Sequence, residues 1–318
     1  MTATSSLPIP VGWYQVAYAD EVAAGQVVPL RSFGVDLIAY RGDGGRVTVM
    51  DAHCPHLGAH IGYGGFVDGD AVVCPFHEWR FDCTGQNVRV PYRDNVNRGA
   101  RLRPWATREL GPAILCWYGP PGHEEPTWEP PSLPELSRDD LMWYTPEEAR
   151  YRFSSHPVEI MENTVDIAHF QYVHGVSGFG AVEIVEKGVM FRADASVTMQ
   201  TGRGEVDGSI ESELWGLGLD VVRPHGLVDG VVLWTVTPVE PGIVDARYSF
   251  LLPHVDGELT NGARKMAAEF QRQANQDIPI WEHKVHHDQP RLASGEGAIM
   301  DFRRWADQFY PGVAEARA

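Results

Sequence analysis

The chain has few cysteines, fewer basic than acidic residues, and no long apolar run. Four cysteines in 318 residues are too few for the disulfide-dense scaffold of a secreted domain. A net charge of −17 opposes binding to the phosphate backbone of nucleic acid. No segment approaches the roughly 20 apolar residues that a membrane-spanning helix needs, and MTATSSLPIPVGW lacks the features of a secretory signal. We therefore predict a soluble, cytoplasmic protein with no membrane span and no nucleic-acid partner.

The length and the proline distribution predict two domains. A chain of 318 residues with 43% hydrophobic and 22% charged residues is typical of globular proteins of one large or two ordinary domains. Six prolines fall between Pro120 and Pro134, a density that opposes both helix and central strand. We predict a first domain over residues 1–120, a proline-rich linker over 121–147 and a second domain over 148–318.

The two domains differ in their predicted secondary structure. From Trp13 to about Tyr118, short β-branched and aromatic runs separated by Gly, Asp and Asn predict a small antiparallel β domain, with strands at Val35–Tyr40 and Val47–Met50 among them. In the second domain, a helix is predicted from Pro157 to His174 and another over about Thr260–Val285. Alternating strands are predicted between them, at Ser209–Leu214, Leu227–Val236 and Val244–Leu251. This order indicates a helix-on-sheet α+β domain.

Two cysteines and two histidines form the first candidate metal site. Cys54-Pro-His56 is followed, after seventeen residues, by Cys74-Pro-Phe-His77. In Rieske centres, two thiolates bind one iron of a [2Fe–2S] cluster and two imidazoles bind the other. Two Cys and two His also suit tetrahedral zinc, and the four residues could instead be unrelated loop members. We favour the cluster, because this spacing is uncommon among zinc sites.

A second candidate site follows in the other domain. His169 and His174 are five residues apart, and Asp166 precedes the first by three. Five residues turn a regular helix by about 500°, so the helix must end or loosen before both rings can bind one metal. Non-haem iron that activates O₂ typically binds two histidines and one carboxylate. This spacing alone is weak evidence for an iron site, and the cluster motif upstream strengthens that interpretation.

The carboxylate ligand is predicted to come from the second long helix. Asp277 falls on its mainly apolar stripe, where a charge is costly to bury unless a metal neutralises it. Asp288 and Asp301 are the alternatives. The other members of the stripe are Met266, Phe270, Gln273 and Trp281.

Residues 54–85, CPHLGAH…CPFHEWRFDCTG, resemble the Rieske domain of ring-hydroxylating oxygenases. Ala59 and Phe76 stand where respiratory Rieske proteins usually add a bridged cysteine pair, so the oxygenase type is favoured. Glu78 replaces a common glycine, as the ketosteroid 9α-hydroxylase group tolerates. QDIPIWEHK…GAIMDFRRWADQFY resembles the 3-ketosteroid 9α-hydroxylase and cholesterol desaturase branch, and D-x₂-H-x₄-H resembles the iron motif of Rieske oxygenases.

The resemblance implies an N-terminal antiparallel β Rieske domain and a helix-grip, START-like catalytic domain. It implies a terminal oxygenase that activates O₂ at Fe(II) to hydroxylate a small apolar, steroid-like or polycyclic substrate. Demethylation, dioxygenation and desaturation remain open on the same machinery. A Rieske electron-transfer protein and a zinc-stabilised binding module are the non-enzyme alternatives. The implied cluster ligands are Cys54, His56, Cys74 and His77, and the implied iron ligands are His169, His174 and Asp277.

The resemblance also implies partners. Electrons would come from NAD(P)H through a flavin reductase, with or without a ferredoxin, because the chain has no G-x-G-x-x-G after a strand. It implies a homotrimer in which Asp166 links His77 of one subunit to His169 of the next. Seven arginines against two aspartates between Arg80 and Arg108 would suit an acidic ferredoxin, although solvated arginines in local salt bridges explain them equally well.

Overall fold

The computed structural model describes residues 7–311 except 177, 179, 181, 202, 203 and 227, and leaves aside the side chains of residues 199–205. The chain forms two compact units. One unit is Tyr14–Pro126, and the other combines the described residues up to Trp13 with those from Thr127 onward. In this division the described residues at the chain start group with the second unit. Part of the predicted linker, Leu141–Tyr144, forms a sheet strand.

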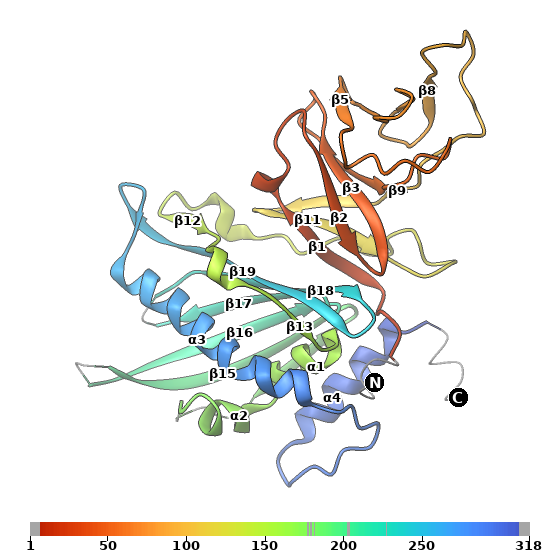
Figure 1. The fold of residues 1–318 in the computed structure, drawn as a ribbon. Helices are drawn as coiled ribbons and strands as arrows, with labels where there is room; N and C mark the ends of the chain where they lie inside the picture. Colours follow the sequence, from red (N-terminus) through yellow and green to blue (C-terminus); the bar gives the residue numbers. More distant parts are fainter. Residues whose placement is uncertain are drawn as a thin grey trace. The chain divides into compact units, whose positions relative to one another are not determined.

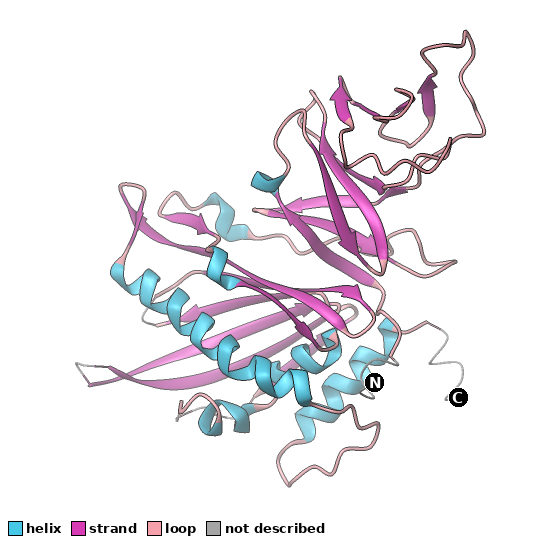
Figure 2. Ribbon diagram, in the orientation of Figure 1, coloured by secondary structure: helices cyan, strands magenta, loops and turns pink. Residues whose placement is uncertain are grey.

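Three small antiparallel sheets form the unit Tyr14–Pro126 (Figure 2). The first sheet contains β1 (Gly12–Tyr18), β11 (Ala113–Tyr118) and β10 (Thr107–Leu110). The second contains β2 (Val27–Ser32), β3 (Val35–Arg41), β4 (Val47–Asp51) and β9 (Pro104–Trp105). The third contains β5 (Phe66–Asp68), β6 (Ala71–Val73), β7 (Arg80–Phe81) and β8 (Asn87–Arg89). A buried cluster that includes Ile38, Met50, Ile61 and Phe81 joins the second and third sheets beneath the cysteine loops.

A 9-stranded antiparallel sheet forms the second unit. Its main path runs in the order β12-β19-β18-β17-β16-β15-β14, and β13 and β20 also pair with β19. The strands are β12 (Leu141–Tyr144), β13 (Arg150–Ser154), β14 (Glu183–Lys187), β15 (Met190–Thr201), β16 (Gly204–Trp215), β17 (Leu219–His225), β18 (Val231–Glu240), β19 (Ile243–Val255) and β20 (Glu258–Leu259). This unit has the predicted helix-on-sheet α+β organisation.

The helix α3 (Asn261–His283) lies along one face of the large sheet (Figure 1). It begins at Thr260, whose hydroxyl oxygen accepts a hydrogen bond from the amide of Ala263 at 3.2 Å. Ala263, Ala267 and Ala274 are buried toward the sheet, because their small side chains let the helix approach closely. The other helices are α1 (Pro157–Met161), α2 (Ile167–Tyr172) and α4 (Gly297–Ala306), with 3-10 turns at Ala19–Glu21, Pro134–Ser137, Glu147–Ala149, Glu162–Thr164 and Asp307–Phe309.

The single helix predicted from Pro157 to His174 is wrong. α1 ends at Met161, a 3-10 turn follows, and α2 begins after Asp166. Asp166 leaves the helical conformation, with φ −86° and ψ 84°, and its carboxylate accepts from the amide of His169. An aspartate in this position caps a new helix rather than continuing the old one. By contrast, α3 continues through Pro279 to His283.

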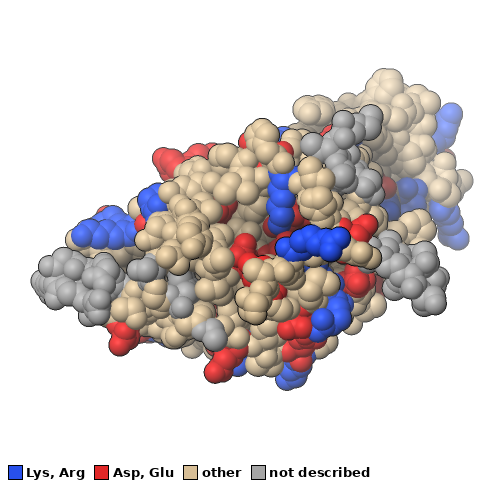
Figure 3. Space-filling model, turned by 90° about the horizontal axis from the view of Figure 1, so that it is seen from below, with Lys and Arg blue, Asp and Glu red and all other residues tan. Residues whose placement is uncertain are grey.

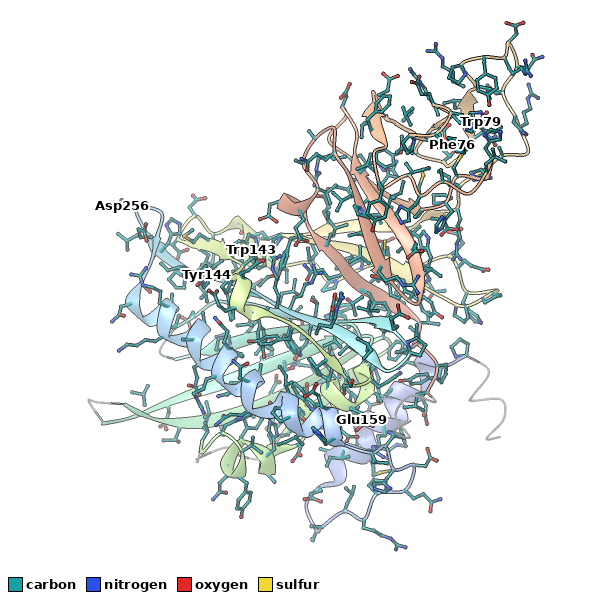
Figure 4. The ribbon with its side chains drawn as sticks, in the orientation of Figure 1. Phe76, Trp79, Trp143, Tyr144, Glu159 and Asp256 are labelled. Carbon is teal, nitrogen blue, oxygen red and sulfur yellow. The ribbon has the colours of Figure 1, made fainter. Side chains whose placement is uncertain are left out.

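Charged side chains join α1 and the following turn to the end of α3 and to α4. Glu159 is 1% exposed and lies beside the last part of α3 (Figure 4). Lys284 places its Nζ 2.9 Å from Glu159 and 2.9 Å from Glu162, and His286 contacts Glu159. Arg303 of α4 donates to Glu162 at 2.5 Å. The network compensates the burial of two carboxylates by three cationic or hydrogen-bonding partners.

The surface carries both signs of charge. On the face seen in Figure 3, acidic and basic side chains lie next to one another rather than in one large patch. Among the helices that the structure describes, none combines the length and the apolar character needed to cross a bilayer.

Candidate metal centres

Two loops of the unit Tyr14–Pro126 have the same backbone pattern. In the first, the amide of Cys54 donates to the carbonyl of Ala59 at 2.9 Å, and the amide of Gly58 donates to the carbonyl of Cys54 at 2.9 Å. In the second, Cys74 and Trp79 make the first bond at 2.9 Å, and Glu78 donates to Cys74 at 3.0 Å. The two motifs found in the sequence are therefore one local structure built twice.

A left-handed residue occupies the same position in each of these loops. Gly58 has φ +78° and Glu78 has φ +54°. Glycine adopts this conformation without steric cost, whereas a residue with a Cβ atom pays about 1–2 kcal/mol. Glycine would therefore adopt the backbone conformation of Glu78 at a lower cost.

The two cysteine sulfurs face each other and backbone amides. Cys54 and Cys74 are 2% and 1% exposed, and their thiols hydrogen-bond each other. The partner thiol lowers the pKa of Cys74 to about 6 against the effect of burial, with further hydrogen bonds from the amides of Phe76 and His77. The same thiol contact and burial raise the pKa of Cys54, against hydrogen bonds from the amides of His56 and Leu57. Amide hydrogen bonds to sulfur are a means of tuning iron–sulfur centres.

The two loop histidines lie together beside the cysteines. The rings of His56 and His77 are 4.6 Å apart between centroids, and His56 stacks on Trp79 at 4.3 Å. Figure 4 shows Phe76 and Trp79 in this loop region. Among the described residues, none hydrogen-bonds the buried Nδ1 of His77. Two buried thiols, two adjacent imidazoles and an orphaned ring nitrogen fit a histidine-ligated [2Fe–2S] cluster.

His169, His174 and Asp277 come together in the second unit. One ligand atom from each lies within 4.8 Å of the other two. The two imidazole rings are 5.1 Å apart and nearly perpendicular, at 81°, and Nε2 of His174 lies 3.3 Å from Oδ2 of Asp277. Because α2 ends at Tyr172, His174 leaves the helical path and turns toward the same point as His169. Because the helix ends before His174, both rings can face one metal, although a regular helix would turn histidines five residues apart to different sides.

Each of these histidines is held through its Nδ1 atom. Nδ1 of His174 is 3.0 Å from Oε1 of Gln276, and Nδ1 of His169 contacts the backbone carbonyl of Asp166. With Nδ1 as the donor in both contacts, each Nε2 keeps a lone pair for a metal. Two neutral imidazoles and a carboxylate form the donor set of a 2-His-1-carboxylate iron site. The residues therefore fit Fe(II).

The electrostatics of the two rings differ. Burial lowers the pKa of His169, and the nearby carboxylates only partly oppose this effect. Burial also acts to lower the pKa of His174, but hydrogen bonds to Asp277 and Gln276 outweigh it and raise that pKa. A lowered pKa favours the neutral ring, which is the form that binds a metal.

The sequence did not identify Gln276 or Arg272. Arg272 donates to Oε1 of Gln276 at 2.7 Å and to the backbone carbonyl of His174 at 3.3 Å, so both residues fix the position of His174. Little in the sequence pointed to either residue, because both precede Asp277 on α3 without lying on its apolar stripe. The competing carboxylates lie elsewhere, since the Asp288 side chain is 72% exposed and Asp301 pairs with Arg304 on α4.

A cavity of about 1390 Å³ opens beside the histidines, between α3 and the large sheet. Its walls are mostly apolar, and Phe170, Trp234 and Phe270 are among them. Among the large apolar side chains of the sheet and its turns, Trp234 lines the cavity, whereas Trp215, Leu217 and Leu219 do not. A cavity of this volume accommodates a multi-ring substrate.

Comparison with known proteins agrees with both centres. Residues 12–100 match the Rieske [2Fe-2S] domain, and residues 116–310, more than half of the chain, match the 3-Ketosteroid 9alpha-hydroxylase C-terminal domain. Cholesterol 7-desaturase of Drosophila melanogaster is 31% identical over 95% of this chain and 75% of its own length. The oxygenase component of a Rhodococcus rhodochrous 3-ketosteroid-9-alpha-monooxygenase is 30% identical over 94% of this chain and 83% of its own.

Solved structures share the fold. Dicamba monooxygenase bound to dicamba has a TM-score of 0.76 at 16% identity, over 96% of this chain and 98% of the other. NdmA of Pseudomonas putida CBB5 with caffeine has a TM-score of 0.78 at 16% identity, over 95% and 91%.

The fold and the matched domains define an iron–sulfur oxidoreductase with a second candidate metal centre. The chain belongs to the Rieske oxygenase family that carries the 3-ketosteroid 9α-hydroxylase C-terminal domain. The matched Rieske domain carries a [2Fe–2S] cluster, and the donor set of His169, His174 and Asp277 fits non-haem Fe(II).

Proposed function

We propose that this chain is a terminal oxygenase that hydroxylates an apolar, steroid-like or polycyclic substrate in the cavity beside His169. Cys54, His56, Cys74 and His77 would hold the cluster, and His169, His174 and Asp277 would hold Fe(II). The convergence of two histidines and one carboxylate within 4.8 Å at the wall of a large apolar cavity carries this proposal. When bound, the cluster supplies single electrons and the mononuclear iron supplies O₂ activation.

The residues around the iron site would perform the positioning. Gln276 and the carbonyl of Asp166 orient the two rings, and α3 presents Asp277 from the opposite side. Apolar walls exclude water from the substrate, and exclusion of water protects reactive species from side reactions. In this proposal a cluster domain and a catalytic domain are separated by the proline-rich linker.

The electron donor would be a separate reductase, with or without a ferredoxin, fed by NAD(P)H. Related proteins bear the name of an oxygenase component, which supports separate partners. We propose that Arg89, Arg93 and Arg98 help to dock an acidic partner. All three are exposed, and among the residues that the structure describes no acid forms an ion pair with them. Arg89→Glu with Arg93→Glu should lower the rate of reduction at low salt, whereas Arg291→Glu, an exposed arginine of the other unit, should not.

We propose a homotrimer in which Asp166 links His77 of one subunit to His169 of the next. In this proposal the orphaned Nδ1 of His77 binds the cluster, which leaves Nε2 of the same ring to donate to Asp166 of the next subunit. Within the chain, Asp166 contacts His169 through its backbone carbonyl, and its carboxylate caps α2. A cytoplasmic location, where thiols stay reduced and reductases are available, belongs to the same proposal.

Iron counting and turnover test the function. The purified protein should contain the two irons of the cluster and one more, and dithionite should produce the EPR signal of a histidine-ligated cluster. Asp277→Asn should lose the third iron and turnover but keep the cluster signal. Asp288→Asn changes an exposed carboxyl that is 72% accessible, and it should keep all three irons. A chain that holds the cluster alone would be an electron carrier, and a colourless zinc protein would refute the proposal.

The reaction outcome is tested by product mass. Steroids, polycyclic aromatics and methyl ethers should be offered with a reconstituted reductase system. A product heavier by one oxygen supports hydroxylation. A product lighter by two hydrogens or by a methylene group would show desaturation or demethylation on the same centre, and would replace the hydroxylation proposed here.

A further inference from the structure

A carboxyl group lies in the wall of the apolar cavity, away from the three iron ligands. Asp220 of β17 is 7% exposed and lines the cavity together with Ser212 of β16. The hydroxyl of Ser212 donates to Oδ1 of Asp220 at 2.6 Å. Among the residues that the structure describes, Ser212 is the hydrogen-bond partner of this carboxyl, so Oδ2 remains available to a ligand.

The strand register places Asp220 relative to the iron site. Asp220 pairs with Trp234 of β18, and Trp234 pairs with Tyr248 of β19. All three residues line the cavity, so they form one row across three strands on the face that α3 covers. Neighbouring strands are about 4.8 Å apart, so Asp220 lies about 10 Å along the sheet from Tyr248. The rings of Tyr248 and Phe270 are 5.9 Å apart between centroids. Phe270 lies on α3 two turns before the proposed iron ligand Asp277.

The surroundings favour the neutral acid. Burial raises the pKa of Asp220 to about 7, because the hydrogen bond from Ser212 offsets desolvation only in part and the charge of Glu213 adds to the rise. A protonated carboxyl can accept from Ser212 with one oxygen and donate from the other. A buried acid is costly where apolar groups such as Val222 and Trp234 could fill the wall, and such a group is a candidate for ligand binding.

We propose that Asp220, supported by Ser212, is the polar anchor of the cavity and hydrogen-bonds an uncharged oxygen substituent, hydroxyl or oxo, on an otherwise apolar fused-ring substrate. The inference rests on the proposed function and adds the determinant of substrate orientation. Because Asp220 is not among the iron ligands and lies across the sheet from Tyr248, such an anchor would present a carbon several bonds from the oxygen substituent to the metal. Asp220 is thus a specificity-determining residue.

The test compares three ligands that differ at one substituent. Cholestane, cholestan-3β-ol and cholestan-3-one are titrated into the holoenzyme, and binding is followed by quenching of tryptophan fluorescence. The wild type should bind the alcohol or the ketone about 10-fold more tightly than the hydrocarbon, because one buried hydrogen bond changes affinity by about this factor. Asp220→Leu should remove this preference without weakening the binding of cholestane, and Asp220→Asn and Ser212→Ala should retain part of it.

Controls separate this inference from the proposed function. Asp245→Asn alters an acid on the same sheet that pairs with Arg152 at 2.6 Å and does not line the cavity, and it should leave the preference unchanged. Iron content and the cluster spectrum are measured on each sample. A chain that lacks the third iron contradicts the proposed function, whereas the ligand preference of Asp220 is tested independently of it. If Asp220→Leu fails to fold, Asp220→Asn and Ser212→Ala test the role of Asp220 in its place, and each should reduce the preference. Equal affinity for all three ligands in the wild type, no binding of any, or a preference as large in these variants as in the wild type would overturn the role of Asp220.

Discussion

Replacing Glu159 by glutamine should cost the protein about 3 kcal/mol of folding free energy at neutral pH. Burial acts to raise the pKa of Glu159, but the hydrogen bond from His286 and the charge of Lys284 outweigh it and hold that pKa at about 2. The difference from its ordinary value of 4.5 corresponds to about 3 kcal/mol. This figure agrees with the about 3–5 kcal/mol lost when one partner of a buried ion pair is removed. Lys284 keeps Glu162 as a partner, so the lower end is expected.

The sign of the pH dependence follows from the lowered pKa. The folded state binds a proton at Glu159 less readily than the unfolded state, so this stabilisation is complete above about pH 5 and declines as the pH falls toward 2. The difference between wild type and Glu159→Gln should therefore narrow steadily between about pH 5 and pH 3. Equilibrium urea unfolding, followed by tryptophan fluorescence at several pH values, measures it.

Glu147→Gln is the matched control. Glu147 is 79% exposed and pairs with Arg150 at 3.3 Å in the same unit, so its loss should cost less than about 1 kcal/mol. If Glu159→Gln costs no more than this control, or if its cost is the same at pH 3 as at pH 7, the buried network does not stabilise the unit in the way described.

Three further outcomes are expected. Asp166→Asn should keep both metal centres and the cap of α2, since asparagine caps as well as aspartate, yet should nearly abolish turnover; normal turnover would remove the bridging role. Gln276→Leu should weaken iron binding about 10- to 100-fold in a chelator competition, because His174 loses its orienting partner; unchanged affinity would contradict that assignment. Glu78→Gly should stabilise the cluster domain by up to about 1 kcal/mol in thermal unfolding, by relieving a left-handed residue; a destabilised variant would show that the Glu78 side chain contributes more than its strain costs.

The sequence predicted those features that depend on local pattern. The long helix was expected over Thr260–Val285 and is observed at Asn261–His283, because a capping threonine and an apolar stripe define it. Strands with clear alternation, such as β3 and β4, begin where they were expected. The α+β class follows from this order of elements, and the α+β class is confirmed by the fold.

Features that depend on distant contacts were not predictable from one sequence. The break at Asp166 was missed because the apolar spacing around it suits a continuous helix, while the carboxylate prefers to cap. Gln276 was missed because its importance comes from His174, which lies far away in the chain. Asp220 was missed because its strand reads as an ordinary apolar segment, and the cavity that it faces exists only after the sheet and α3 have packed.

The two sides of the iron site come from remote parts of the chain, since His174 and Gln276 are 102 residues apart. A metal bound there would act as a tether that closes a loop of this length, and closing long loops limits the freedom of the unfolded chain. Loss of iron should then do more than stop catalysis. Metal depletion should also let α3 move away from the segment after α2. Because α3 forms one wall of the cavity, the substrate site would then be less well ordered.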